Sequence, residues 1–230
     1  MNHRVGWRMA VGGPLASFGA LQVLGRISGT TRAERRARMP GDTFVTGPNL
    51  QTTHAVTIRA EPRHVWPWLV QMGWHQGGFY TSPLVDKILF PANQPSVRHI
   101  IGELQDRAIG EFIPDGPPEA ECGYVISHLD PGRSLVLHSD SHLPLSWRRR
   151  GARLDWTWDF LLVPRGESTR LVFRARGVAA PAWVWLVYQA VVVPADFVMA
   201  GQMMRGLARR AECLAGHSNS GHERRAHQSP

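Results

Sequence analysis

The stretch DWTWDFLLVPRGESTRLVFRARG, from Asp155 to Gly177, carries the pattern that decides the fold. Hydrophobic and polar residues alternate over 154–163 and again over 169–176, and a period of two is typical of half-buried β-strands. Gly166 lies in the short polar turn between the two runs, as in a hairpin. One face of the first run presents Leu154, Trp156, Trp158, Phe160 and Leu162. The stretch therefore predicts an antiparallel hairpin with one aromatic, apolar face.

The position of the turn also predicts the register of this hairpin. A turn centred near Gly166 places Asp159 opposite Arg174, on the face away from the tryptophans. We expect the two charges to pair across the strands. Exposed pairs of this kind contribute only about 0–1 kcal/mol to stability. Their value here is that finding the two residues opposite each other would confirm the strand register.

The same reasoning places the other elements around the hairpin. The alternation over Thr52 to Ala60 predicts a strand, and helical spacing after Pro62 predicts a short helix that Gly73 ends. A second short helix is expected over Ser82 to Phe90. Three further strands are expected over Gly110 to Pro114, Gly123 to Leu129 and Ser134 to Ser139.

The end of the chain has helical spacing from Pro181 to Leu214, interrupted by Pro194. A proline ring inside a helix removes a hydrogen bond and clashes with the preceding turn. We therefore expect an apolar piece over Ala182 to Val193 and a long helix from about Ala195. The whole order, which is a strand, two helices, about five antiparallel strands and a long helix, predicts an α+β domain with one curved sheet.

Four segments resemble the START-like, polyketide-cyclase-like superfamily that is often called SRPBCC. They are AVTIRAEPRHVWPWLVQMGW (Ala55 to Trp74), GGFY (Gly77 to Tyr80), the hairpin Asp155 to Gly177, and PADFVMAGQMMRGLARRAE (Pro194 to Glu212). The resemblance implies the helix-grip fold, in which a curved antiparallel sheet wraps around a long C-terminal helix. It implies little about function, because helix-grip proteins include lipid carriers, hormone receptors and aromatase/cyclases.

The matched segments divide the chain into three parts. Residues 1–39 form an apolar and basic prefix, and the helix-grip domain is expected over residues 40–215. Residues 216–230 form a polar tail without apolar periodicity, for which we expect disorder. The prefix contains an apolar run from Met9 to Gly25 that is shorter than the roughly 20 residues needed to span a bilayer. An anchor, a signal and a helix packed on the domain or on a membrane surface all remain open for this run.

Charge and cysteine content restrict the partners. The net charge is +8 and Lys87 is the only lysine. The arginines gather in three separate places, Arg32 to Arg38, Arg148 to Arg153 and Arg205 to Arg225, and not on one recognition helix, so we expect no nucleic-acid partner. Two cysteines without a CxxC pair predict no disulfide framework, which favours a cytoplasmic setting with membrane association as an alternative.

The common catalytic motifs are missing from the sequence, so whether the protein is an enzyme stays open, and we expect no cofactor and no metal. The tail histidines His217, His222 and His227 are interpreted as solvated, because a metal site needs ligands in fixed geometry. His128 and His138, with Asp130 and Asp140 nearby, are interpreted as solvent-facing side chains of a sheet.

Seven residues are the candidates for ligand binding: Trp68, His75, Tyr80, Trp158, Phe160, Met199 and Met203. The tryptophans and Phe160 would form a wall for flat or aliphatic ligands, and the methionines an adaptable one. Tyr80 would donate a hydrogen bond at the cavity mouth, and His75 could act as acid or base. Ordinary core packing is the competing interpretation for each aromatic residue and each methionine.

Three functions compete. The first is binding of a hydrophobic small molecule, lipid-like or polyketide-like, between the closing helix and the sheet. The second is a cyclase or dehydratase that uses the same cavity, in which Tyr80 or His75 moves a proton. The third is an interaction module on a membrane surface, which would use the apolar prefix, Ala182 to Val193 and the arginine clusters. The sequence does not predict the oligomeric state.

Overall fold

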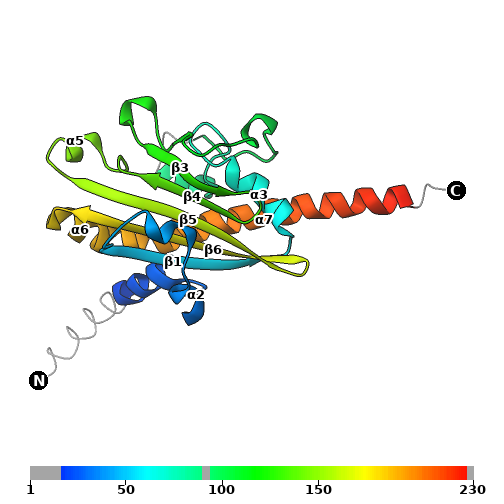
Figure 1. The fold of residues 1–230 in the computed structure, drawn as a ribbon, viewed down its shortest axis with the longest axis horizontal. Coiled ribbons are helices and arrows are strands. Elements are labelled where there is room, and N and C mark those ends of the chain that lie inside the picture. The colour runs from blue at the N-terminus through cyan, green and yellow to red at the C-terminus, as the bar shows by residue number, and fades with distance from the viewer. Residues whose placement is uncertain (1–16, 90–93, 227–230) are drawn as a thin grey trace, which may run out of the picture.

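The computed structural model describes residues 17–89 and 94–226, and its centre is one curved antiparallel sheet (Figure 1). The sheet has six strands in the order β1-β6-β5-β4-β3-β2. The strands are β1 (Leu50–Ile58), β2 (Phe112–Pro114), β3 (Gly123–Asp130), β4 (Ser134–Ser139), β5 (Arg153–Arg165) and β6 (Ser168–Ala180). Every expected strand is therefore present.

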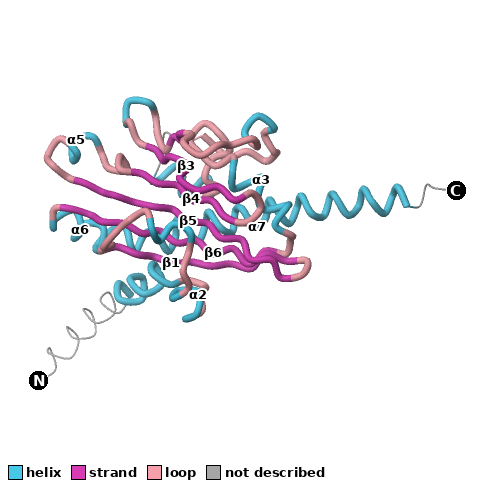
Figure 2. The backbone as a smooth tube through the Cα atoms, in the orientation of Figure 1, coloured by secondary structure: helices cyan, strands magenta, loops and turns pink. Residues whose placement is uncertain are grey.

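Along the chain the helices lie mainly between β1 and β2 and after β6, and Figure 2 shows them around the sheet. The N-terminal part contains a helix over residues 17–27, α2 (Arg32–Arg36) and η1 (Pro40–Thr43). The connections hold α3 (Pro62–Val70), α4 (Pro83–Leu89), η2 (Gly102–Leu104), η3 (Pro118–Ala120) and α5 (Leu145–Arg148). The chain ends with α6 (Ala182–Val187), the π-helical turn η4 (Tyr188–Val192) and α7 (Val193–Ala226). This order confirms the predicted α+β, helix-grip architecture.

The hairpin of β5 and β6 forms the middle of the sheet in the predicted register. Trp158 lies opposite Ala175, and Phe160 lies opposite Phe173. Paired residues of an antiparallel sheet project to the same face, so this face collects the aromatic side chains. Gly177 lies opposite Trp156, and a Cβ atom on it would come within 2.3 Å of the indole ring. A small residue is needed there to make room for the tryptophan.

Helix α7 packs along the inner face of the sheet and extends beyond it toward the C-terminus (Figure 1). Met203, Leu207 and Ala211 are buried at spacings of four residues, as expected for one side of a helix. Gly206 allows a close approach, because a Cβ atom on it would lie 1.9 Å from the carbonyl oxygen of Tyr80. The closing helix is thus fixed against both the sheet and the loop after α3.

The outer face of the sheet is covered by the N-terminal segment. Arg174 binds the Asp42 carboxylate at 2.8 Å and donates to the backbone carbonyls of Glu34, Arg35 and Ala37. Arg170 binds Glu34 at 2.8 Å. The expected exposed pair of Asp159 and Arg174 is therefore wrong, although the register is right. Both side chains are buried under residues 34–42, which the sequence pattern had assigned partly to a separate prefix.

The long helix α7 begins at Val193, close to the expected start at Ala195, and the apolar piece before it forms α6 and the π-helical turn of Tyr188–Val192. The interruption expected at Pro194 is therefore a change to π-helical hydrogen bonding just before the proline. The side chain of Gln22 donates to the carbonyl of Gln189 in this turn. The helix also continues through the start of the expected disordered tail, from Gly216 to Ala226; residues 227–230 lie outside the described part.

The segment Ala182–His217 contains an 18-residue window with mean hydropathy 1.6, so by length and composition it could cross a membrane. Part of this segment is in the core, since Val184 and Leu207 are almost completely buried. Leu186 and Val191 are exposed over 56% and 60% of their surface. The helix over residues 17–27 packs against the same region, where a Cβ atom on Gly25 would lie 1.9 Å from the Val193 carbonyl oxygen. The segment thus has both a buried and an exposed apolar side.

Candidate functional site

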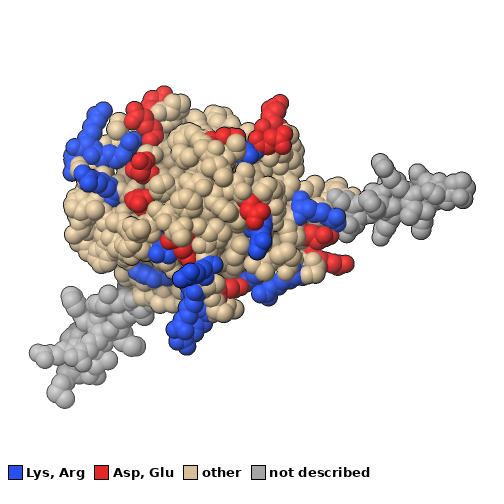
Figure 3. All heavy atoms as spheres, viewed as in Figure 1, with Lys and Arg blue, Asp and Glu red and all other residues tan. Residues whose placement is uncertain are grey.

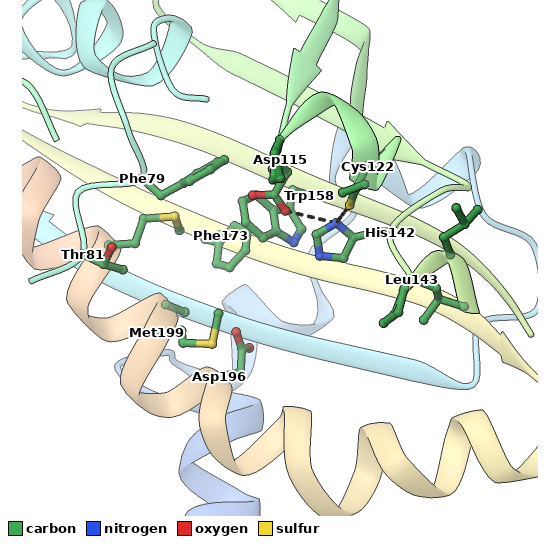
Figure 4. Close-up of a pocket in the computed structure, with 17 residues that line it drawn as sticks. Phe79, Thr81, Asp115, Cys122, His142, Leu143, Trp158, Phe173, Asp196 and Met199 are labelled. Carbon is green, nitrogen blue, oxygen red and sulfur yellow. Dashed lines mark hydrogen bonds and ion pairs between the residues drawn. The ribbon is translucent and has the colours of Figure 1, made fainter. Parts of the chain in front are cut away.

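A cavity of about 390 Å³ lies between α7 and the inner face of the sheet (Figure 4). Apolar side chains form most of its wall, which includes Phe79, Leu143, Trp158, Phe173, Met199 and Met203. The two methionines come from α7, Trp158 comes from β5, and Phe173 comes from β6. The cavity therefore lies where a sheet face of period two meets a helix face of period 3.6.

Trp158 is the centre of the aromatic wall. Its ring centroid lies 4.8 Å from that of Tyr124 and 5.6 Å from that of Phe173. Phe79, on the loop after α3, makes an edge contact with Trp158 at 6.0 Å. These distances are typical of favourable aromatic pairs. Several rings from different elements thus surround the cavity.

Three of the seven predicted ligand-binding residues line this cavity, namely Trp158, Met199 and Met203. Phe160 does not, because it stacks on Phe173 with a centroid distance of 4.8 Å and is fully buried. Trp68 lies in a different pocket, of about 700 Å³, together with Arg98 and Arg209. The period-two pattern places Trp158 and Phe160 on one face but does not say which of them borders an empty space.

Tyr80 and His75 are also not at the cavity mouth. Tyr80 is completely buried, and its hydroxyl donates to the carbonyl of Trp68 at 2.7 Å. The guanidinium of Arg210 lies 4.7 Å from the centre of its ring. His75 is exposed and its ring lies against that of Trp74. The packing interpretation therefore describes Tyr80, and its neighbours Phe79 and Thr81 reach the cavity instead.

The sequence pattern missed a group of polar side chains in the cavity wall: Asp115, Cys122 and His142. Nδ1 of His142 lies 3.2 Å from a carboxylate oxygen of Asp115 and 3.5 Å from Sγ of Cys122 (Figure 4). Nε2 of the same ring lies 3.4 Å from the Tyr124 hydroxyl. The three residues are 7 and 20 positions apart in sequence, a spacing that matches no short motif.

Strand topology explains how these residues meet. Asp115 follows the last residue of β2, Cys122 precedes the first residue of β3, and His142 comes three residues after β4 ends. Neighbouring antiparallel strands run in opposite directions, so the end of β2, the start of β3 and the end of β4 lie side by side at one end of the sheet. Polar residues just outside three successive strand ends are the signal that could have identified the group.

Burial dominates the electrostatics of this group. It raises the pKa of the Asp115 carboxyl to about 7 and that of the Cys122 thiol to about 12. It lowers the pKa of His142 to about 4. Asp115 and His142 keep 20% and 25% of their side-chain surface, and both line the cavity. Charged forms are therefore disfavoured for all three residues.

A second carboxylate also faces the cavity. Asp196, near the start of α7, lines it and accepts a hydrogen bond from Nε2 of His54 at 2.8 Å. The His54 side chain is completely buried and stacks on Phe173 with a centroid distance of 6.2 Å. A buried histidine that holds a cavity-facing carboxylate is an arrangement that can orient a base.

The two histidines that the sequence placed on neighbouring strands are in the sheet but outside the cavity. His138 binds Asp155 at 2.6 Å and not Asp140, and His128 lies 2.9 Å from the Ser134 hydroxyl. Both histidines are partly exposed. Their placement fits the interpretation as surface-facing sheet residues.

No family model matches the sequence, and no curated protein matches it. Solved structures with some likeness include protein MLL2253 from Mesorhizobium loti, with a TM-score of 0.41, 15% identity, and coverage of 70% of this chain and 96% of that one. Norcoclaurine synthase from Thalictrum flavum has a TM-score of 0.41 and 14% identity, covering 70% and 84%. Major latex-like protein 151 from Panax ginseng has a TM-score of 0.41 and 13% identity, covering 70% and 97%. These values give no ground for transferring a ligand or an activity.

Proposed function

We propose that this protein binds a hydrophobic small molecule in the cavity between α7 and the sheet. The observation that carries the proposal is the cavity itself, about 390 Å³ in volume with a mainly apolar wall. Sites for small organic ligands have volumes of about 300–1,000 Å³ and a few well-placed polar groups. A solid core would leave no space of this size, because protein interiors are close-packed.

The wall also favours certain ligand shapes. Trp158, Phe173 and Phe79 present ring faces and edges that suit a flat or cyclic body. Met199 and Met203 are flexible and polarisable, so they adapt to an aliphatic part. Charged and titratable side chains lie at two places in the wall, one formed by Asp115 with His142 and the other by Asp196. The best-fitting ligand is apolar over most of its surface and carries one or two hydroxyl or carbonyl groups.

Native mass spectrometry of the protein purified from its own host tests the proposal. We expect a population with added mass of one small molecule, which is released on denaturation and can be identified. The variant Ala200→Trp places an indole in the cavity wall and should reduce this population. Protein that carries no added mass and also takes up no apolar compound from an extract would contradict the proposal.

Acid–base catalysis in the same cavity is the second candidate, favoured by the pair of His54 and Asp196. The carboxylate faces the cavity and the buried ring fixes its position, which is what a general base in a cyclase or dehydratase requires. The variant Asp196→Asn separates the two functions. It should keep binding of the co-purified compound, and it should abolish any slow chemical conversion of that compound by the wild-type protein.

A further inference from the structure

We infer that Asp115, Cys122 and His142 form a binding site for a divalent metal ion of the zinc class at the edge of the cavity. The proposed ligand atoms are a carboxylate oxygen, Sγ and Nδ1, all within 4.8 Å of one another. This site goes beyond the binding of a hydrophobic molecule, because the cavity could hold such a molecule without a metal.

The distances fit a tetrahedral ion. Bonds of about 2.3 Å to sulfur and about 2.0–2.1 Å to nitrogen or oxygen place sulfur and nitrogen about 3.6 Å apart across a tetrahedral angle, and nitrogen and oxygen about 3.4 Å apart. Cys122 Sγ lies 3.5 Å from His142 Nδ1, and the Asp115 oxygen lies 3.2 Å from it. Two edges of the tetrahedron are therefore already close to their required lengths.

Hydrogen bonding alone leaves this arrangement incompletely satisfied. A single ring nitrogen, Nδ1 of His142, faces both the carboxylate of Asp115 and the thiol of Cys122. A neutral ring offers at Nδ1 either one proton or one lone pair, so Nδ1 forms one good hydrogen bond, with the carboxyl of Asp115 or with the thiol of Cys122, and not both. A cation between the three atoms satisfies all of them at once.

The surroundings hold the ligands as a metal site requires. Nε2 of His142 lies 3.4 Å from the Tyr124 hydroxyl, so its N–H has an oxygen to donate to while Nδ1 coordinates. The Tyr188 hydroxyl donates to the His142 carbonyl at 3.3 Å. Arg148 donates to the carbonyl of Ala120 at 3.0 Å, two residues before Cys122. Such outer contacts fix the orientation of ligating side chains.

The charges balance when the ion binds. The thiol of Cys122 and the carboxyl of Asp115 give up their protons to solvent and become a thiolate and a carboxylate, while His142 stays neutral. The two negative charges then neutralise the dication. A bound dication stabilises both negative charges in the cavity wall, where a coordinating thiol is deprotonated outright.

Three protein ligands leave a fourth position. Because Asp115, Cys122 and His142 all line the cavity, that position faces the space where the hydrophobic molecule would bind. Zinc sites with three protein ligands and one open position bind water or an oxygen of a substrate. The site would therefore recognise a hydroxyl or carbonyl oxygen at one end of an otherwise apolar ligand.

Cobalt titration of the full-length, chelator-treated protein tests the site. Co²⁺ in a tetrahedral site with a thiolate gives intense visible bands and a sulfur-to-cobalt charge-transfer band. We expect one equivalent of Co²⁺ to produce both, and Zn²⁺ to displace it. Cys122→Ser should remove the charge-transfer band, and Asp115→Asn should weaken binding at least tenfold. Cys213→Ser is the matched control, because Cys213 is the other cysteine and lies outside the cavity.

A second measurement covers the case in which Cys122→Ser does not fold. Zn²⁺ should slow the alkylation of Cys122 in the wild-type protein at least tenfold, read by mass spectrometry of its peptides, and leave Cys213 unchanged. Absence of the thiolate band in the wild-type protein, its loss in Cys213→Ser, or alkylation of Cys122 at the same rate with and without Zn²⁺ would each overturn the site. Uptake of an apolar fluorescent probe by the metal-free protein reports separately on ligand binding.

Discussion

Asp159 and Arg174 lie directly opposite each other on β5 and β6, but Arg174 forms its close ion pair with Asp42, at 2.8 Å. Asp159 instead accepts a hydrogen bond from the backbone N–H of Gly41 at 2.6 Å. Its other carboxylate oxygen is buried without a hydrogen-bond partner among the described residues. Burial raises the pKa of Asp159 to about 7, and the nearby charge of Asp42 acts in the same direction.

This raised pKa predicts a pH dependence of stability. The folded state holds the Asp159 proton up to about pH 7, because its pKa is raised, whereas the unfolded chain releases the proton near the ordinary aspartate pKa of 3.8. Stability from this group is therefore greatest at low pH and declines as the pH rises from about 4 to about 7. Asp159→Asn keeps an oxygen for Gly41 and removes the charge, so we expect it to be more stable than wild type by about 1–3 kcal/mol at pH 8.

Urea unfolding at pH 5 and pH 8 measures this effect. The advantage of Asp159→Asn should be larger at pH 8 than at pH 5. Asp106→Asn, which changes an exposed carboxyl, should show no such difference. An Asp159→Asn variant that is less stable than wild type at pH 8 would mean that the ionised form is well paired after all.

The prefix gives a second prediction. Removal of residues 1–39 takes away Glu34, which binds Arg170, and three carbonyls that accept from Arg174. A chain that begins at Pro40 should therefore lose about 3 kcal/mol or more in unfolding free energy, because breaking buried ion pairs is costly. A chain that begins at Ser17 is the control and should unfold at nearly the wild-type urea concentration. Equal stability of the two truncated chains would show that the segment is dispensable.

The contact between α7 and the Tyr80 loop gives a third prediction. In Gly206→Ala the new methyl group meets the Tyr80 carbonyl oxygen at 1.9 Å, so helix or loop must move. We expect a loss of about 1–3 kcal/mol. In Gly201→Ala, on the same helix, the nearest atoms belong to the flexible end of Arg205 at 3.5 Å, and alanine favours helix by about 1 kcal/mol. In thermal unfolding, Gly206→Ala should have a lower midpoint temperature than wild type, and Gly201→Ala a higher one.

Exposed apolar residues near the start of the C-terminal helices predict contact with a membrane surface. Leu186 and Val191 are more than half exposed, and the face of the molecule shown in Figure 3 carries separate groups of basic side chains among acidic ones. Replacing both residues with glutamate should reduce co-sedimentation with anionic vesicles at least fivefold. Leu84→Glu, at a residue 68% exposed on α4, is the control. Equal sedimentation of wild type and the double variant would show that Leu186 and Val191 do not contact the membrane.

The sheet and most helices could be predicted from sequence because burial leaves a direct mark on the chain. From Leu154 to Leu162 on β5 every second residue is apolar because one face of the strand forms the core, and Gly166 fixes the turn and hence the register. The continuation of α7 past Gly216 could not be predicted in this way, since the helix projects beyond the sheet and has no apolar face there.

The cavity wall was less predictable than the fold. Trp158 and Phe160 carry the same pattern, and only the tertiary structure shows that one borders the cavity and the other packs against Phe173. His142, Asp115 and Cys122 lie in loops without periodicity, so their meeting depends on which strand ends lie side by side at one end of the sheet. Residues 34–39 were placed in a separate prefix because their partners on β6 are more than a hundred positions away.

Binding of an apolar fluorescent probe to Met203→Trp and Met204→Trp tests the central claim most directly. Both methionines are on α7 and 5% exposed, but Met203 lines the cavity and Met204 lies outside it, in the packed core. We expect wild type to bind the probe. Met203→Trp should unfold near the wild-type temperature and bind the probe at least tenfold more weakly, because the indole occupies the cavity. Met204→Trp should lose about 1–3 kcal/mol of stability. Equal destabilisation of both variants, with no probe bound by wild type, would contradict a ligand-binding cavity.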